Sequence, residues 1–199
     1  MTSYSKTFLD ETVQILGRIP PEDIDAVVRL ILETREQGGR VFFCGSGGGA
    51  GHSSHAACDF RKLGRIEAYS VTDNVSELTA RVNDDGWDDS YADWLRASRL
   101  GPKDCLFVFS VGGGDAELNI SVNLVNAMRL ARDVGASITG IVGREGGAVR
   151  EWAEAFIHIP TVDPATVTAQ TEGLQAVFWH LIVTHPELSP ETPKWESSV

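Results

Sequence analysis

The chain has 199 residues, of which 42% are hydrophobic, enough to build one compact domain with its own core. Its formal charge of -11 and its 17 scattered basic residues argue against nucleic acid as a partner. No stretch approaches the roughly 20 apolar residues that span a bilayer, and the N-terminus lacks the layout of a signal peptide, so we expect no membrane attachment and a cytoplasmic location.

The first residues carry two helical patterns. Apolar residues recur at helical spacing before and after a break at Pro20 and Pro21, which predicts an amphipathic helical pair over residues 1–38. Together with a later apolar helix, this pair offers surplus apolar surface for self-association.

Short apolar runs then alternate with helical stretches. The predicted strands cover residues 41–44, 66–69, 105–109, 138–142 and 156–159. The predicted helices cover residues 51–63, 87–100, 116–134, 147–154 and 167–183. This alternation is typical of an α/β fold with a parallel sheet and helices on both faces. We expect a single domain over residues 1–199, with the α/β core at 39–185 and a loosely held polar tail at 186–199.

The three cysteines, Cys44, Cys58 and Cys105, are odd in number and lie in apolar or helical contexts. We therefore expect reduced thiols rather than disulfides. For Cys58 the simplest interpretation is a small buried side chain.

A glycine-rich loop, Gly45–Gly51, follows the first predicted strand and leads into a helix. Such a loop is either a tight turn or an anion site, because glycines let a ligand approach the backbone and the helix start offers unpaired N–H groups. With Glu67 about 20 residues further on, the loop also fits a dinucleotide fingerprint, but one match of this kind is weak.

A second loop of the same kind, Ser110–Asp115, follows the third predicted strand. In a doubly wound sheet, the loops after the first and third strands flank the point where the winding reverses. The two loops therefore predict a small ligand held from both sides. Residues 143–147 form either a third element at the rim of this site or a plain turn.

Two histidines and an acid are candidates for chemistry. His55 and Asp59 are four residues apart on one helical face, so they either converge on a metal or substrate oxygen or belong to a solvated face. His180 lies within an apolar helical stretch, where a histidine is ordinarily part of the core. Asn83 and Asp84 lie in a predicted polar turn.

In the order of these motifs the chain resembles SIS-domain proteins, and among them the phosphoheptose isomerases. The matching features run from the helical pair through the loop at Cys44–Gly48, His55 with its acid, Asn83–Gly86, the loop at Ser110 and residues 143–147 to His180. The resemblance implies a flavodoxin-like, doubly wound sheet of five parallel strands. It also implies a homotetramer, a phosphorylated sugar as substrate and one zinc ion per subunit.

The resemblance also implies roles for individual residues. The implied metal ligands are His55, Asp59, Glu172 and His180, and the implied catalytic residues are His180, Asp59 and Glu172. The implied substrate-binding residues are Ser46, Gly47, Gly48, Asn83, Asp84, Ser110, Val111, Gly112, Asp115 and Glu172.

This chain departs from the isomerases in both glycine loops. Ser46 stands in place of an asparagine, and the second loop keeps only the hydroxyl of Ser110 and gains the acidic Asp115. Phosphate recognition would then depend on Ser46, Ser110 and backbone N–H groups, assisted by a basic residue from elsewhere in the chain or from another subunit. Glu172 and His180 are also separated by roughly 12 Å if one helix carries both.

The leading functional hypothesis is an isomerase that converts sedoheptulose 7-phosphate into D-glycero-heptose 7-phosphate through an enediol. The alternative is a non-catalytic SIS protein that binds a sugar phosphate for regulation or assembly. A nicotinamide-dependent oxidoreductase is a distant third.

Overall fold

The structure is a computed structural model that describes residues 3–189. Its centre is a sheet of five parallel strands in the order β2-β1-β3-β4-β5. The strands are β1 (Val41–Gly45), β2 (Ala68–Ser70), β3 (Cys105–Ser110), β4 (Ser137–Val142) and β5 (Ala155–His158). This order is the flavodoxin-like one, with the winding reversed between β1 and β3, so the predicted fold class is confirmed.

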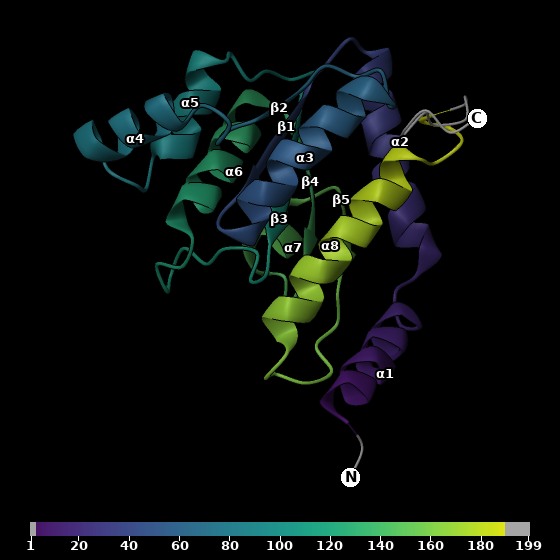
Figure 1. Ribbon diagram of the computed structural model, residues 1–199. Coiled ribbons are helices and arrows are strands. Elements are labelled where there is room, and N and C mark those ends of the chain that lie inside the picture. Colours follow the sequence, from purple (N-terminus) through teal and green to yellow (C-terminus); the bar gives the residue numbers. More distant parts are fainter. Residues whose placement is uncertain (1–2, 190–199) are drawn as a thin grey trace.

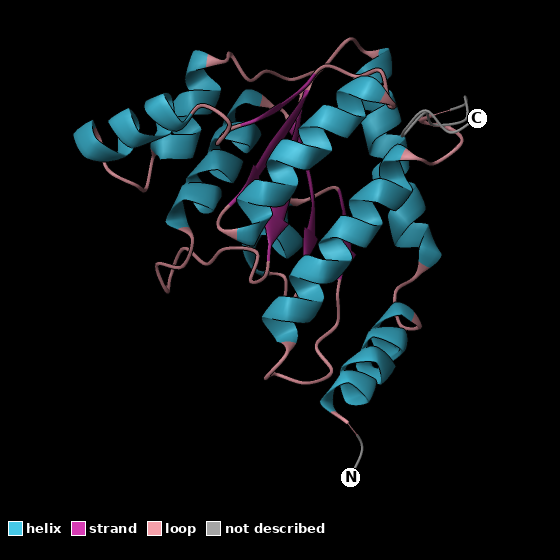
Figure 2. Ribbon diagram, in the orientation of Figure 1, coloured by secondary structure: helices cyan, strands magenta, loops and turns pink. Residues whose placement is uncertain are grey.

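Eight helices surround the sheet in the described part of the chain (Figures 1 and 2). They are α1 (Tyr4–Leu16), α2 (Pro21–Glu36), α3 (Gly48–Lys62), α4 (Val75–Asp84), α5 (Ser90–Ala97), α6 (Val122–Val134), α7 (Gly147–Trp152) and α8 (Val167–Val183). None of the helices within residues 3–189 combines the length and apolar character that crossing a bilayer requires.

Side chains that alternate along the strands build a core on each face of the sheet. Phe43 and Phe107 point into one core, which α2, α3 and α8 cover. Phe42 and Leu106 point into the other core, which α5, α6 and α7 cover. Both faces of the central strands are therefore buried, which explains why these strands are continuous apolar runs in the sequence.

The N-terminal helices do not form a closely packed pair. Figure 1 shows α1 running away from α2, and side-chain hydrogen bonds tie α1 to the start of α8 instead. Thr12 donates to Gln170 Oε1 at 2.9 Å, and Gln170 Nε2 donates to the Phe8 carbonyl at 3.0 Å. By contrast, α2 packs along β5 and belongs to the core.

Three predictions about helices were wrong. Residues 75–84 form α4, where no helix was predicted, and the helix predicted over 87–100 is the shorter α5. The helix predicted from residue 116 begins only at Val122, because Asn119 and Ser121 have φ of 57° and 52°, outside the helical region.

The beginning of the predicted tail is firmly held. Leu188 is fully buried, and its carbonyl accepts a hydrogen bond of 2.8 Å from the Arg35 guanidinium. Ser189 donates to the Leu63 carbonyl at 2.9 Å. Residues 186–189 therefore pack against the domain, and the rest of the predicted tail, 190–199, lies outside the described residues.

Candidate active site

The two glycine loops meet at the carboxyl ends of β1 and β3. These strands are direct neighbours, with Gly45 paired to Phe109 at the end of the ladder. A Cβ atom on Gly49 would lie 2.6 Å from the Phe109 carbonyl oxygen, closer than any side chain tolerates. The start of α3 therefore presses its backbone against the end of β3, and both loops face the same crevice.

A cavity of about 440 Å³ lies in this crevice. Both loops line it, together with the start of α6, the turn over residues 143–147, and Glu172 and Gln175 of α8. Ser110 Oγ accepts a hydrogen bond of 3.0 Å from the Gly113 N–H, which leaves the hydroxyl hydrogen available to a ligand. Two predicted substrate-binding serines, Ser46 and Ser110, thus line one cavity.

Buried amide side chains support both loops. Gln175 Nε2 donates to the Ile141 carbonyl at 2.8 Å, and Asn123 Nδ2 donates to Ser46 Oγ at 3.3 Å. Both side chains are fully buried, yet Gln175 Oε1 and Asn123 Oδ1 accept no hydrogen bond within the described chain. Gln175 lines the cavity and Asn123 contacts it through Ser46, so these amides set the positions of the loop residues that face a ligand.

Asp115 lines the cavity, but its carboxylate is engaged by the loop itself. Asp115 Oδ1 accepts hydrogen bonds of 2.9 Å from the N–H groups of Glu117 and Leu118. Its backbone N–H and carbonyl both pair with Ile120 at 2.9 Å. Asp115 therefore shapes the 115–121 loop, and part of its negative charge is offset by backbone donors.

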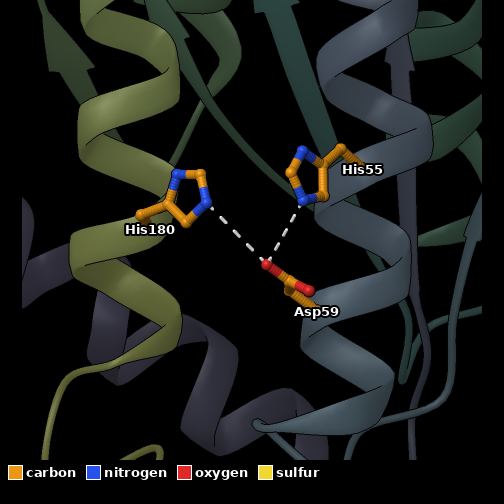
Figure 3. Close-up of side chains that lie close together, drawn as sticks. All are labelled: His55, Asp59 and His180. Carbon is orange, nitrogen blue, oxygen red and sulfur yellow. Dashed lines mark ion pairs between the residues drawn. The ribbon is translucent and has the colours of Figure 1, made fainter. Parts of the chain in front are cut away.

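His55, Asp59 and His180 come together between α3 and α8 (Figure 3). Asp59 Oδ2 lies 3.6 Å from His55 Nε2 and 3.9 Å from His180 Nε2. The Asp59 side chain is only 6% exposed, and its Oδ2 accepts no hydrogen bond from the described residues. His180 Nδ1 lies 2.7 Å from the Ala176 carbonyl, which favours the tautomer with a lone pair on Nε2.

The donor set fits a zinc ion. Ligand atoms about 2 Å from tetrahedral zinc are roughly 3.3 Å apart. The two distances from Asp59, 3.6 and 3.9 Å, need only small side-chain adjustments, and all three ligand atoms lie within 4.8 Å of one another. Two imidazoles and a carboxylate with a fourth position left open are typical of catalytic rather than structural zinc. The buried carboxylate oxygen without a hydrogen-bond donor points to the same kind of occupant.

The structure does not bring the predicted fourth ligand, Glu172, into this cluster. Glu172 lies two helical turns before His180 on α8, so the rise of the helix separates them by roughly 12 Å. Its carboxylate lies instead over the first residue of α3, where a Cβ atom on Gly48 would come within 2.6 Å of Oε2. Glu172 therefore belongs to the cavity.

His52 lies on α3 between Gly49, which lines the cavity, and His55 of the cluster. It lies on the same face of α3 as His55 and Asp59, because positions 52, 55 and 59 follow helical spacing. Burial lowers the pKa of His52, the backbone and carboxylate of Glu172 oppose this effect, and His55 and His180 add to it. His52 is therefore predominantly neutral at neutral pH and can accept a proton.

Two other predictions about site residues do not agree with the structure. Asn83 and Asp84 end α4 rather than lying in a turn; both are exposed, bond to each other at 2.7 Å, and do not line the cavity. Cys58, expected to be buried, is exposed on α3, whereas Cys44 and Cys105 are buried, and all three are free thiols.

Sequence reasoning missed several residues of the site. Asn123 and Gln175 carry no motif of their own, and only the packing of α6 and α8 against the loops brings them there. Tyr91 was also missed, although its hydroxyl donates to the Gly45 carbonyl at 2.8 Å and thereby anchors the first loop. Burial raises the pKa of Tyr91, so the hydroxyl keeps the proton that it donates.

Known proteins resemble this chain over most of its length. The lincomycin biosynthesis protein LmbN of Streptomyces lincolnensis is 31% identical over 92% of this chain and 69% of its own. The phosphoheptose isomerase of Akkermansia muciniphila is 35% identical over 80% of this chain and 82% of its own. The structure of phosphoheptose isomerase GmhA from Neisseria gonorrhoeae matches with a TM-score of 0.76 and 22% identity, over 90% of this chain and 95% of that one.

The family model for the SIS domain matches residues 7–143, from α1 to the end of β4. The matched region contains both glycine loops, His55 and Asp59. Because it covers more than half of the chain, and the fold agrees with that of GmhA, this protein belongs to the SIS domain family.

Proposed function

We propose that this protein is an aldose–ketose isomerase of phosphorylated sugars, with sedoheptulose 7-phosphate as the ketose and D-glycero-heptose 7-phosphate as the aldose. One observation carries the proposal: His55, Asp59 and His180 cluster between α3 and α8, and the same two helices line the cavity between the two glycine loops. The similarity to proteins named phosphoheptose isomerase supports the reaction class.

The row of polar side chains between α3 and α8 supplies the groups that the reaction needs. Passage through an enediol requires a base that moves a proton between C1 and C2, and an acid that serves the oxygens. Glu172 lines the cavity, so we assign the transfer between the two carbons to its carboxylate. His52 is adjacent and predominantly neutral, so it can take and return a proton at an oxygen.

The carbonyl end of the sugar is assigned to the cluster. Asp59 Oδ2 lies within 4 Å of the Nε2 atoms of both His55 and His180. His180 presents Nε2, because its Nδ1 is occupied by the Ala176 carbonyl. A zinc ion held by His55, Asp59 and His180 would supply Lewis-acid polarisation of a carbonyl oxygen.

The phosphate end is assigned to the glycine loops. Ser46 and Ser110 contribute hydroxyls, and Gly47, Val111 and Gly112 contribute backbone positions that a phosphate can approach closely. Gly48, also predicted to bind substrate, is covered by the Glu172 carboxylate instead. Asp115 supports the loop rather than the phosphate, because backbone N–H groups already occupy its Oδ1.

We also propose that the protein forms a homo-oligomer, as a tetramer, in the cytoplasm. Leu9 and Val13 of α1 are 63% and 71% exposed, and Val177 of α8 is 50% exposed. Surfaces of this kind favour association with further copies of the chain. Size-exclusion chromatography with light scattering should give four times the chain mass of 21.6 kDa, and a monomer would contradict this part of the proposal.

The second candidate is a protein that binds a sugar phosphate without converting it. The single hydroxyl in the Ser110 loop favours this alternative, since few groups remain to grip a phosphate tightly. NMR of the purified protein with sedoheptulose 7-phosphate, with added zinc and after chelation, separates the two. New aldose signals support the isomerase, and their loss on chelation gives the metal a role. Broadened ligand signals without product support the binding protein.

A further inference from the structure

Among the described residues that line the cavity, only Arg144, in the turn over residues 143–147, carries a positive charge. Asp115, Glu145 and Glu172, which also line it, are acidic. An anionic ligand therefore meets an unfavourable field unless Arg144 and the loop N–H groups outweigh it locally.

This turn is fixed to the Ser110 loop by direct backbone contact. A Cβ atom on Gly113, which has a φ of 76°, would collide with the Gly146 carbonyl, so the two segments touch without side chains between them. The Ala148 N–H donates to the Gly114 carbonyl at 2.9 Å, and the Val149 N–H donates to the Gly113 carbonyl at 3.3 Å. Ser110 and Arg144 are therefore presented to the cavity by one rigid unit.

The backbone of Arg144 is held in an uncommon conformation. Its φ is 46°, in the left-handed region that an arginine rarely adopts, and its carbonyl lies 2.6 Å from His158 Nε2. The side chain runs past the second glycine loop, with Cδ 4.0 Å from the position of a Cβ atom on Gly112. The guanidinium forms no ion pair within residues 3–189, so its charge is available to a ligand.

A buried glutamine fixes the Ser110 loop from the side of α8. Gln175 is completely buried, and its Nε2 donates to the Ser110 and Ile141 carbonyls at 3.3 and 2.8 Å. The strand end that carries Ser110 is therefore held in place on the cavity side as well.

We propose that Arg144 binds the phosphate group of the substrate and replaces hydroxyls that the Ser110 loop lacks. This inference rests on the proposed function, since it assigns a binding residue within the same site. A guanidinium suits the task, because its fork of N–H groups matches two phosphate oxygens at once.

The test compares Arg144→Gln and Arg144→Lys with a matched control, Arg150→Gln. Arg150 is an exposed arginine of α7 that does not line the cavity. Binding of sedoheptulose 7-phosphate is measured by calorimetry and binding of inorganic phosphate by phosphorus NMR, with melting temperatures to verify folding. We expect Arg144→Gln to weaken the binding of the sugar phosphate and of inorganic phosphate by about 10- to 100-fold. The two affinities should also depend less on salt concentration than in the natural protein. Arg144→Lys should bind with intermediate affinity, and Arg150→Gln should bind as the natural protein does.

The outcomes separate this inference from the isomerase proposal. Equal affinities in Arg144→Gln, Arg150→Gln and the natural protein would overturn the role of Arg144, while turnover would still support the isomerase. Weaker binding in Arg144→Gln alone supports the inference, whether or not the natural protein produces an aldose. If the natural protein bound neither sedoheptulose 7-phosphate nor inorganic phosphate, both the role of Arg144 and the isomerase proposal would be overturned.

Discussion

Asp59 of α3 and His180 of α8 face each other across 3.9 Å, although nearly the whole α/β core separates them in the sequence. Their proximity follows from packing: Phe60 next to Asp59, and Trp179 next to His180, are buried in the same core on one face of the sheet. Asp59 is thereby fixed in a buried position, where a carboxylate needs a cationic or metal partner.

Replacing Asp59 with asparagine should remove zinc from the protein. Loss of a residue that only hydrogen-bonds to a metal ligand weakens metal binding by roughly 10- to 100-fold. Asp59 is proposed as a direct ligand, so its loss should weaken zinc binding by more than that. Metal analysis after dialysis should find about one zinc per chain in the natural protein and almost none in Asp59→Asn. Added zinc should raise the melting temperature of the natural protein only.

Asp73→Asn is the control for this experiment, because Asp73 is exposed and bonds to Ser54 outside the cluster. It should keep its zinc. If Asp59→Asn retained the metal as well as the control does, the ligand set would be wrong.

Replacing His180 with alanine should abolish turnover and leave binding largely intact. We expect kcat to fall by at least about 100-fold, because His180 is assigned to hold the zinc ion that polarises the substrate carbonyl, whereas KM should change little. His185→Ala serves as the control, since His185 follows α8 and lies outside the cluster. Unchanged kcat in His180→Ala would remove that residue from the mechanism.

Two glycines of α3 should respond to alanine in opposite ways. A Cβ atom on Gly49 would press against the Phe109 carbonyl, so Gly49→Ala should lower the free energy of unfolding by about 1–3 kcal/mol. A Cβ atom on Gly51 meets nothing within 4 Å, so Gly51→Ala should raise it by about 0.5–1 kcal/mol through helix propensity. Urea denaturation of both variants measures this difference, and a stable Gly49→Ala would show that the first loop is not closely packed.

The buried thiols of Cys44 and Cys105 should make the protein less stable in alkali. Burial raises the pKa of both thiols well above the ordinary value, so the folded state keeps protons that the unfolded chain loses above a pH of about 8.5. Their contribution to stability is therefore complete below that pH and declines above it, by up to about 1.4 kcal/mol per pH unit for each thiol.

Urea denaturation at several alkaline pH values measures this slope. The double variant Cys44→Ala, Cys105→Ala should have a shallower slope than the natural protein. Cys58→Ala, which changes the exposed thiol, should keep the natural slope. Equal slopes in all three proteins would mean that the buried thiols do not control alkaline stability.

The sequence predicted the sheet well, because strands buried on both faces are short apolar runs that few other elements imitate. Runs such as Cys105–Phe109 mark the centre of the sheet without ambiguity. By contrast, α4 was missed: it has no buried residue, its Val75 and Val82 are exposed, and only Leu78 packs against a core. The short bridged loop between Asp115 and Ile120 was also missed, since backbone pairing of that kind leaves no periodic signal.

The candidate site was partly predictable for a similar reason. Helical spacing alone brings His55 and Asp59 together, and only the resemblance to a family pointed to His180. The same helical geometry explains why Glu172 cannot join that cluster from α8 and lies at the cavity instead. Supporting residues such as Asn123 and Gln175 depend on three-dimensional packing, which spacing does not reveal.

The most direct test of the isomerase is turnover of sedoheptulose 7-phosphate in heavy water, followed by NMR. The base takes a proton from C1 of the ketose, and this proton can exchange with deuterium from the solvent before it is returned to C2. The aldose should therefore carry deuterium at C2. The account predicts this deuterated aldose from the natural protein and none from His180→Ala. Absence of any aldose from the zinc-loaded natural protein would contradict the account.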